Sequence, residues 1–168
     1  FMAPVLTFAM TAAITPGPNN IILSTNAVNY GFKETIPLMM GVFFGFLSIL
    51  TLCLLGIGEL YQSFPAIAAI VKTVATCFLV YLSFRIFFSS SFSDGGSSKK
   101  FSFMDIYFFQ IINPKAVTVS MSSSAIFIQN KFSYQIEFLL IFICFVISTS
   151  TSAIAWAAIG HSFRKYLN

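Results

Sequence analysis

The first long apolar stretch of the sequence, residues 3–28, is interrupted by Ile14-Thr15-Pro16-Gly17-Pro18-Asn19-Asn20. Its two prolines remove two backbone donors and obstruct the carbonyl groups one turn earlier. Gly17 also allows backbone angles that other residues avoid. We therefore expect a broken helix here. In hydrocarbon, the backbone groups that a break frees are costly unless they face protein or a wet cavity.

A second interruption, Asn113-Pro114-Lys115, lies in the apolar stretch 103–128 and is also followed by polar residues. Paired proline-interrupted spans at corresponding positions indicate a transporter site near the membrane midplane. The N-termini of half-helices offer N–H groups and a positive dipole end to a carboxylate. The amides beside both prolines, at Asn19, Asn20 and Asn113, add donors and acceptors for a zwitterion. A simple proline kink is the alternative, and it is favoured for either break taken alone.

The composition excludes a soluble globular domain. Of 168 residues, 57% are apolar and only 8% are charged, whereas soluble domains carry about 25% charged residues. The mean hydropathy is +0.88. We predict an all-α integral membrane protein, because five stretches reach the roughly 20 apolar residues that a spanning helix needs. These stretches are approximately 3–28, 36–59, 65–88, 103–128 and 134–159.

The only long polar linker is residues 89–100, which read SSSFSDGGSSKK. Its serine and glycine content predicts a flexible loop. The linker divides one transmembrane transporter domain, residues 1–168, into a first repeat of three spans (1–88) and a second, incomplete repeat of two (101–168).

The charged residues predict how the chain lies in the membrane. If all five stretches cross, six basic residues share one side and only Lys131 lies on the other; the six are Lys33, Arg85, Lys99, Lys100, Arg164 and Lys165. The positive-inside rule then places the six in the cytoplasm and the N-terminus outside, although a re-entrant first segment would invert part of this. All five acids, Glu34, Glu59, Asp94, Asp105 and Glu137, fall at or beyond span ends, where we expect solvated charges.

Several residues inside the spans admit two interpretations. Lys115 lies well inside a span. In the functional interpretation its ammonium binds a substrate carboxylate or exchanges a proton. In the other interpretation its side chain snorkels towards water. Gly41 and Gly45 form a GxxxG motif that predicts close helix packing. Because two copies of a small membrane protein often pair through such glycine faces, a homo-oligomer is also compatible with the sequence. The hydroxyl run 148–152 either lines a polar path or bonds to backbone carbonyls and neighbouring helices.

The sequence does not support a metal site, a nucleic-acid site or a catalytic site. The spacing of Cys53, Cys77 and Cys144 fits no zinc or iron–sulfur pattern. The basic residues form no patch of the kind that binds nucleic acid. His161 is the only histidine and no carboxylate lies inside a span, so we predict no catalytic residues, no metal, no cofactor and no enzymatic activity.

Several motifs together resemble the LysE/RhtB family of amino-acid efflux permeases, and most closely its cysteine/O-acetylserine exporter branch. They are Ile14 to Asn20, Gly31-Phe32-Lys33, Gly41 and Gly45, Lys72 through Tyr81-Leu82 to Arg85, Phe109 to Ala116, Trp156-Ala157 and Gly160-His161. The resemblance covers nearly the whole chain. It implies a small permease of the bacterial cytoplasmic membrane, driven by an ion gradient and built from repeated three-helix halves.

The chain departs from that family pattern in two ways. Members usually have six hydrophobic segments, whereas here the sequence stops at Asn168, so either a sixth helix has been lost or this is a five-span variant. Some members also carry an acidic residue in the second span and another in the fourth. The corresponding neighbourhoods here read Phe46 and Val119, so a carboxylate proton relay is not supported.

The function we expect is secondary active efflux of small amino acids or their derivatives. Alternating access would act at a midplane site formed by Pro16, Gly17, Pro18, Asn19, Asn20, Asn113, Pro114 and Lys115. The expected partners are the amino-acid substrate and the lipid bilayer. The alternative is a non-transporting structural or assembly protein, or an inactive truncated relative.

Overall fold

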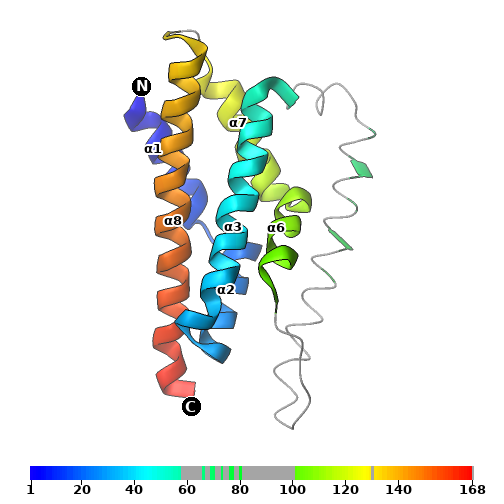
Figure 1. The fold of residues 1–168 in the computed structure, drawn as a ribbon, viewed down its shortest axis with the longest axis vertical. Helices are drawn as coiled ribbons and strands as arrows, with labels where there is room; N and C mark the ends of the chain where they lie inside the picture. Colours follow the sequence, from blue (N-terminus) through cyan, green and yellow to red (C-terminus); the bar gives the residue numbers. More distant parts are fainter. Residues whose placement is uncertain are drawn as a thin grey trace.

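A computed structural model describes residues 1–57, 101–129 and 131–167, together with the single positions 66, 69, 70, 73, 76, 77 and 80. Every secondary-structure element with defined bounds in these parts is a helix, which confirms the expected all-α class (Figure 1). Most of the expected third stretch, 65–88, and the whole expected loop, 89–100, lie outside the described residues.

Six α-helices and one π-helical turn make up the described fold. They are α1 (Met2–Ile14), α2 (Pro18–Tyr30), α3 (Phe32–Leu52), the turn η1 (Cys53–Ile57), α6 (Phe103–Ile112), α7 (Pro114–Phe127) and α8 (Tyr134–Leu167). In the described part of the chain, two segments are long and apolar enough to cross a membrane, Phe32–Gly56 and Tyr134–Arg164. Helix α8 continues past 159, where the expected stretch ended.

Each proline-containing interruption lies between two short helices. Helix α1 ends at Ile14, and α2 begins at Pro18 after Gly17, whose backbone is extended. Helix α6 ends at Ile112, and α7 begins at Pro114. Proline suits the first helical position, because the N–H that it lacks has no acceptor within the helix there.

Helices α3 and α8 run side by side through the molecule, and the shorter helices pack around them (Figure 1). Helix α3 begins where α8 ends, and Gly31 accordingly lies against the side chain of Arg164. We call this the Lys33 end. At the opposite end α1 begins, α7 ends and α8 begins, and the rings of Phe1 and Phe132 pack edge to face with centroids 5.7 Å apart. We call this the Lys131 end.

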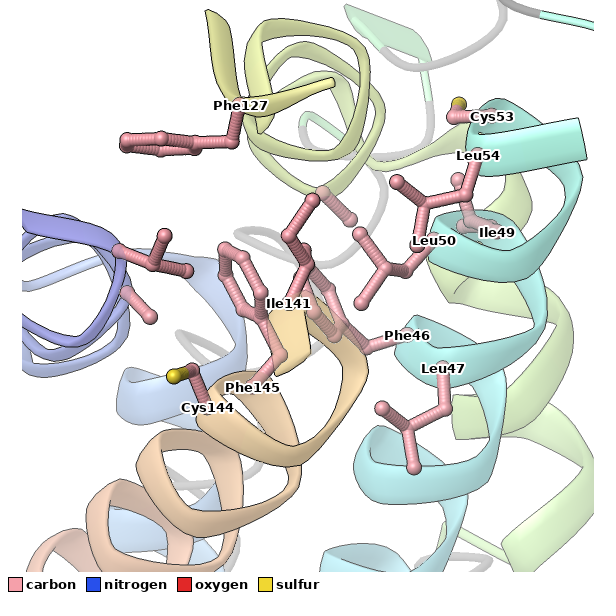
Figure 2. Close-up of a cluster of buried hydrophobic side chains, with 13 residues drawn as sticks. Phe46, Leu47, Ile49, Leu50, Cys53, Leu54, Phe127, Ile141, Cys144 and Phe145 are labelled. Atoms are coloured by element: carbon pink, nitrogen blue, oxygen red, sulfur yellow. The ribbon is translucent and has the colours of Figure 1, made fainter. Parts of the chain in front are cut away.

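Two buried hydrophobic clusters lie at different heights along α3 and α8. The Phe145 cluster, towards the Lys131 end, is drawn in Figure 2 and comprises Val5, Ala9, Phe46, Leu47, Ile49, Leu50, Cys53, Leu54, Ala116, Phe127, Ile141, Cys144 and Phe145. The Phe109 cluster, towards the Lys33 end, comprises Ile22, Leu23, Leu38, Val42, Ile106, Phe109 and Ala153. The space between the two clusters is where the helix breaks meet.

One of the expected solvated acids is buried. Glu137, in the first turn of α8, has no exposed surface. Its carboxylate accepts hydrogen bonds from the backbone N–H groups of Gln129 (2.9 Å), Lys131 (2.8 Å) and Phe132 (3.2 Å). The expectation of a solvated charge was therefore wrong for Glu137, because three backbone donors from the residues between α7 and α8 point at this side chain.

Candidate functional site

Side chains join the two helix breaks directly. Lys115, in the first turn of α7, donates from Nζ to the Thr15 carbonyl at 2.5 Å. The amides of Asn19 and Gln110 exchange two hydrogen bonds, each 2.9 Å long. Asn113 Nδ2 also donates to Asn19 Oδ1 at 3.2 Å. Segments that lie about a hundred residues apart in the chain therefore form one polar centre.

The carbonyl groups at the end of α1 find partners on neighbouring helices. The last carbonyls of any helix lack intrahelical donors. Here Ala13 O accepts from Asn20 Nδ2 at 3.1 Å and from Ser152 Oγ at 2.7 Å. Ile14 O accepts from Trp156 Nε1 at 3.3 Å. Side chains of α2 and α8 thus satisfy backbone groups that would be costly to leave unpaired in a membrane.

A pocket of about 550 Å³, its open mouth included, lies against this polar centre. Polar lining residues are Asn19, Asn20, Asn113, Lys115, Thr149 and Ser152. The others are Ala12, Ala13, Gly17, Pro18, Leu23, Val42, Phe46, Ala116, Val119, Phe145 and Ala153. Lys115 is the one charged side chain among these described lining residues.

The pocket gathers most of the residues that the sequence singled out. Gly17, Pro18, Asn19, Asn20, Asn113 and Lys115 all line it. Pro16 and Pro114 are not among the lining residues. Gly17 leaves room for the lysine, because a Cβ atom there would lie 3.0 Å from Lys115 Cδ and 3.1 Å from Nζ.

The glycines of α3 position a residue that the sequence analysis missed. A Cβ atom on Gly41 would lie 2.7 Å from the Phe103 carbonyl oxygen. One on Gly45 would lie 2.8 Å from the Tyr107 carbonyl oxygen and 2.5 Å from Gln110 Cγ. The backbones of α3 and α6 therefore approach closely, and Gln110 is fully buried between them. An isolated glutamine in an apolar run was the signal that could have identified it.

The hydroxyl run of α8 shows both of its expected behaviours. Ser148 and Thr151 donate to the carbonyls four residues earlier, each at 2.7 Å. Thr149 and Ser152 instead line the pocket. Their spacing of three places them on one helical face. Phe46 and Phe145 add aromatic lining to the pocket. The sequence analysis named Phe46 only as a position where some family members carry an acid, and no local pattern distinguishes Phe145 among the 22 phenylalanines.

Apolar helices of spanning length, beside a pocket that has a polar centre between interrupted helices, are features of a membrane transport protein. The family description "LysE type translocator" matches residues 10–168, and the chain belongs to this family. It is therefore a membrane transporter and not an enzyme, and the resemblance drawn from its motifs is confirmed.

Named relatives match over nearly the full chain. A cysteine/O-acetylserine efflux protein of Shigella flexneri is 26% identical over 170 residues, which cover 98% of this chain and 87% of the relative. A protein of the same name from Escherichia coli strain K12 is 26% identical over 160 residues, which cover 95% of this chain and 82% of the relative. These relatives point to a bacterial inner-membrane protein. No solved structure gives a significant match.

Proposed function

We propose that this chain exports a small amino acid or amino-acid derivative across the bacterial cytoplasmic membrane, and that the pocket between the helix breaks binds the substrate. The observation that carries the proposal is the position of Lys115, the one charged side chain among the described lining residues, in the first turn of α7 and close to Gly17 at the start of α2. The efflux of cysteine or O-acetylserine named for its relatives supports a substrate with a small side chain.

The pocket can meet each charge of a zwitterion. A substrate carboxylate would replace the Thr15 carbonyl as the partner of the Lys115 ammonium, and a charged acceptor binds such a donor more strongly than a neutral one. First-turn N–H groups of α2 and α7 favour an anion at the same place. The hydroxyl oxygens of Thr149 and Ser152, on the α8 side, are acceptors for the substrate ammonium group.

The proposed transport cycle is alternating access through five spans, with residues 1–88 and 101–168 acting as related halves. The pocket is lined at one height by members of the Phe145 cluster and at the other by members of the Phe109 cluster. Opening one cluster at a time would expose the substrate to one face at a time. The breaks at Pro16–Pro18 and Pro114 allow the half-helices α1, α2, α6 and α7 to reorient separately.

The test is amino-acid efflux from dipeptide-loaded cells that express the wild type, Lys115→Met or the control Lys131→Met. Lys131 lies in the exposed α7–α8 connection, so its variant should export like the wild type. A hydrogen bond to a charged group contributes about 1.5–3 kcal/mol. Its loss predicts a tenfold or greater decrease in the export rate for Lys115→Met, compared at equal amounts of protein in the membrane. Normal export by Lys115→Met would overturn the proposed site. No export by a correctly inserted wild type would favour a structural or assembly role.

A further inference from the structure

Two phenylalanine rings form the wall of the pocket on the side of the Lys131 end. Phe46 comes from α3 and Phe145 from α8, and both line the pocket while belonging to the Phe145 cluster (Figure 2). Their ring centroids are 5.4 Å apart with planes tilted by 37°. Only 8% of Phe46 and 1% of Phe145 is exposed. The contact therefore closes this side of the pocket with two large side chains.

Further aromatic contacts hold this wall in place. The ring of Phe145 packs edge to face on Phe8 of α1, with centroids 6.5 Å apart. Phe8 in turn packs on Phe127 of α7, with centroids 5.6 Å apart. Edge-to-face pairs at these distances are favourable beyond the area they bury. The wall is thus supported from α1 and α7, the two half-helices that extend from the breaks towards the Lys131 end.

The other walls of the pocket set where a substrate side chain can go. The asparagine amides and Lys115 come from the helix breaks, whereas the hydroxyl groups of Thr149 and Ser152 come from α8. A substrate whose carboxylate lies at Lys115 therefore directs its side chain into the apolar part of the pocket. The largest residues there are Phe46 and Phe145, and their burial and mutual packing leave them little freedom to move aside.

We infer that Phe46 and Phe145 determine specificity: their paired rings limit the length of the substrate side chain that the pocket accepts. The inference rests on the proposed export of a small amino acid. It adds the two residues that exclude substrates with longer side chains. One methylene group in an apolar pocket changes selectivity by roughly 10- to 200-fold. Shortening either ring should therefore shift the ratio of long to short amino acids exported by tenfold or more.

The experiment compares export of free alanine, cysteine, valine and leucine by cells expressing Phe46→Ala, Phe145→Ala or the wild type. Phe44→Ala is the matched control, because Phe44 lies on the same helix but is 45% exposed and does not line the pocket. Replacing a buried phenylalanine by alanine costs about 3–5 kcal/mol. Phe46→Leu and Phe145→Leu are therefore included, because they retain apolar packing. The export ratio is taken from them if the alanine variants do not reach the membrane.

The expected result is a tenfold or greater rise in the leucine-to-alanine export ratio for the Phe46 and Phe145 variants, with no change for Phe44→Ala. An unchanged ratio at normal membrane level would overturn this inference and leave the proposed export standing. Loss of all export by the leucine variants at normal membrane level would also overturn a role in size selection. Absence of export by the wild type would overturn both proposals together.

Discussion

Lys115 shows how a single charged residue is accommodated at a helix break. Its ammonium donates to the Thr15 carbonyl at the end of α1, which also accepts from Asn20 Nδ2 at 3.0 Å. The contact pairs the charge with a backbone carbonyl beside the pocket, which is consistent with the proposed substrate-binding role. Asn19 is engaged differently, because both of its amide atoms bond to Gln110 or Asn113. We expect Asn19 to hold the breaks together and Lys115 to meet the substrate.

Glu137 leads to a stability prediction at the same scale. Its carboxylate accepts from three backbone N–H groups in the α7–α8 connection, and Glu137→Ala would remove both acceptor oxygens and leave the three donors without this partner. Each unsatisfied buried group costs about 1–3 kcal/mol, and water would form some of the missing hydrogen bonds. We therefore expect a decrease of about 2–4 kcal/mol in the free energy of unfolding. Glu137→Gln, which retains one carbonyl oxygen, should lie between Glu137→Ala and the wild type.

The measurement is the thermal unfolding midpoint of purified protein in detergent. Gln135→Ala is the matched control, because Gln135 lies two residues earlier on α8 and is exposed; its midpoint should equal that of the wild type. If Glu137→Ala and Gln135→Ala unfold at the same temperature, the buried carboxylate does not stabilise the connection.

At the scale of elements, the sequence could predict where helices are interrupted and which of those residues share a pocket, but not which side chains pair there. Pro16, Pro18 and Pro114 act on their own backbone within one turn, so their effect is visible in the sequence. The pairing of Asn19 with Gln110 depends on how α2 and α6 dock, which no local pattern encodes. Glu137 was misjudged for the same reason, because its burial depends on the path of a connection rather than on its place at a span end.

The close contact of α3 with α6 predicts a cost for the smallest enlargement of Gly45. In Gly45→Ala the new methyl group would lie 2.5 Å from Gln110 Cγ and 2.8 Å from the Tyr107 carbonyl oxygen. Overpacking of this kind costs about 1–3 kcal/mol, and it should displace the Gln110 amide from Asn19. We expect a lower unfolding midpoint and slower amino-acid export. The control is Met40→Ala, because Met40 is on α3 and 43% exposed. Equal midpoints for the two variants would show that the helices do not approach this closely.

At the scale of the whole molecule, the pocket lies between two hydrophobic clusters, and the described residues place more basic side chains at one end than at the other. Lys33 and Arg164 lie at the end where α3 begins and α8 ends, beyond the Phe109 cluster. Lys131 lies at the other end, beyond the Phe145 cluster. The positive-inside rule therefore assigns the Phe109 cluster to the cytoplasmic side of the pocket. In this orientation a substrate leaving the cell passes the Phe145 cluster last.

This orientation is tested by labelling single cysteines with a membrane-impermeant maleimide. The natural Cys53, Cys77 and Cys144 are first replaced by alanine, and either Lys131→Cys or Lys33→Cys is then introduced; both lysines are exposed. We expect Lys131→Cys to be labelled in intact cells and Lys33→Cys only after permeabilisation. Lys33 lies in the first turn of α3 and Lys131 in the connection between α7 and α8, so the result does not depend on residues 58–100. The opposite pattern would place the Phe145 cluster on the cytoplasmic side. Phe46 and Phe145 would then select the substrate as it enters the pocket from the cytoplasm, and not as it leaves the pocket for the outside.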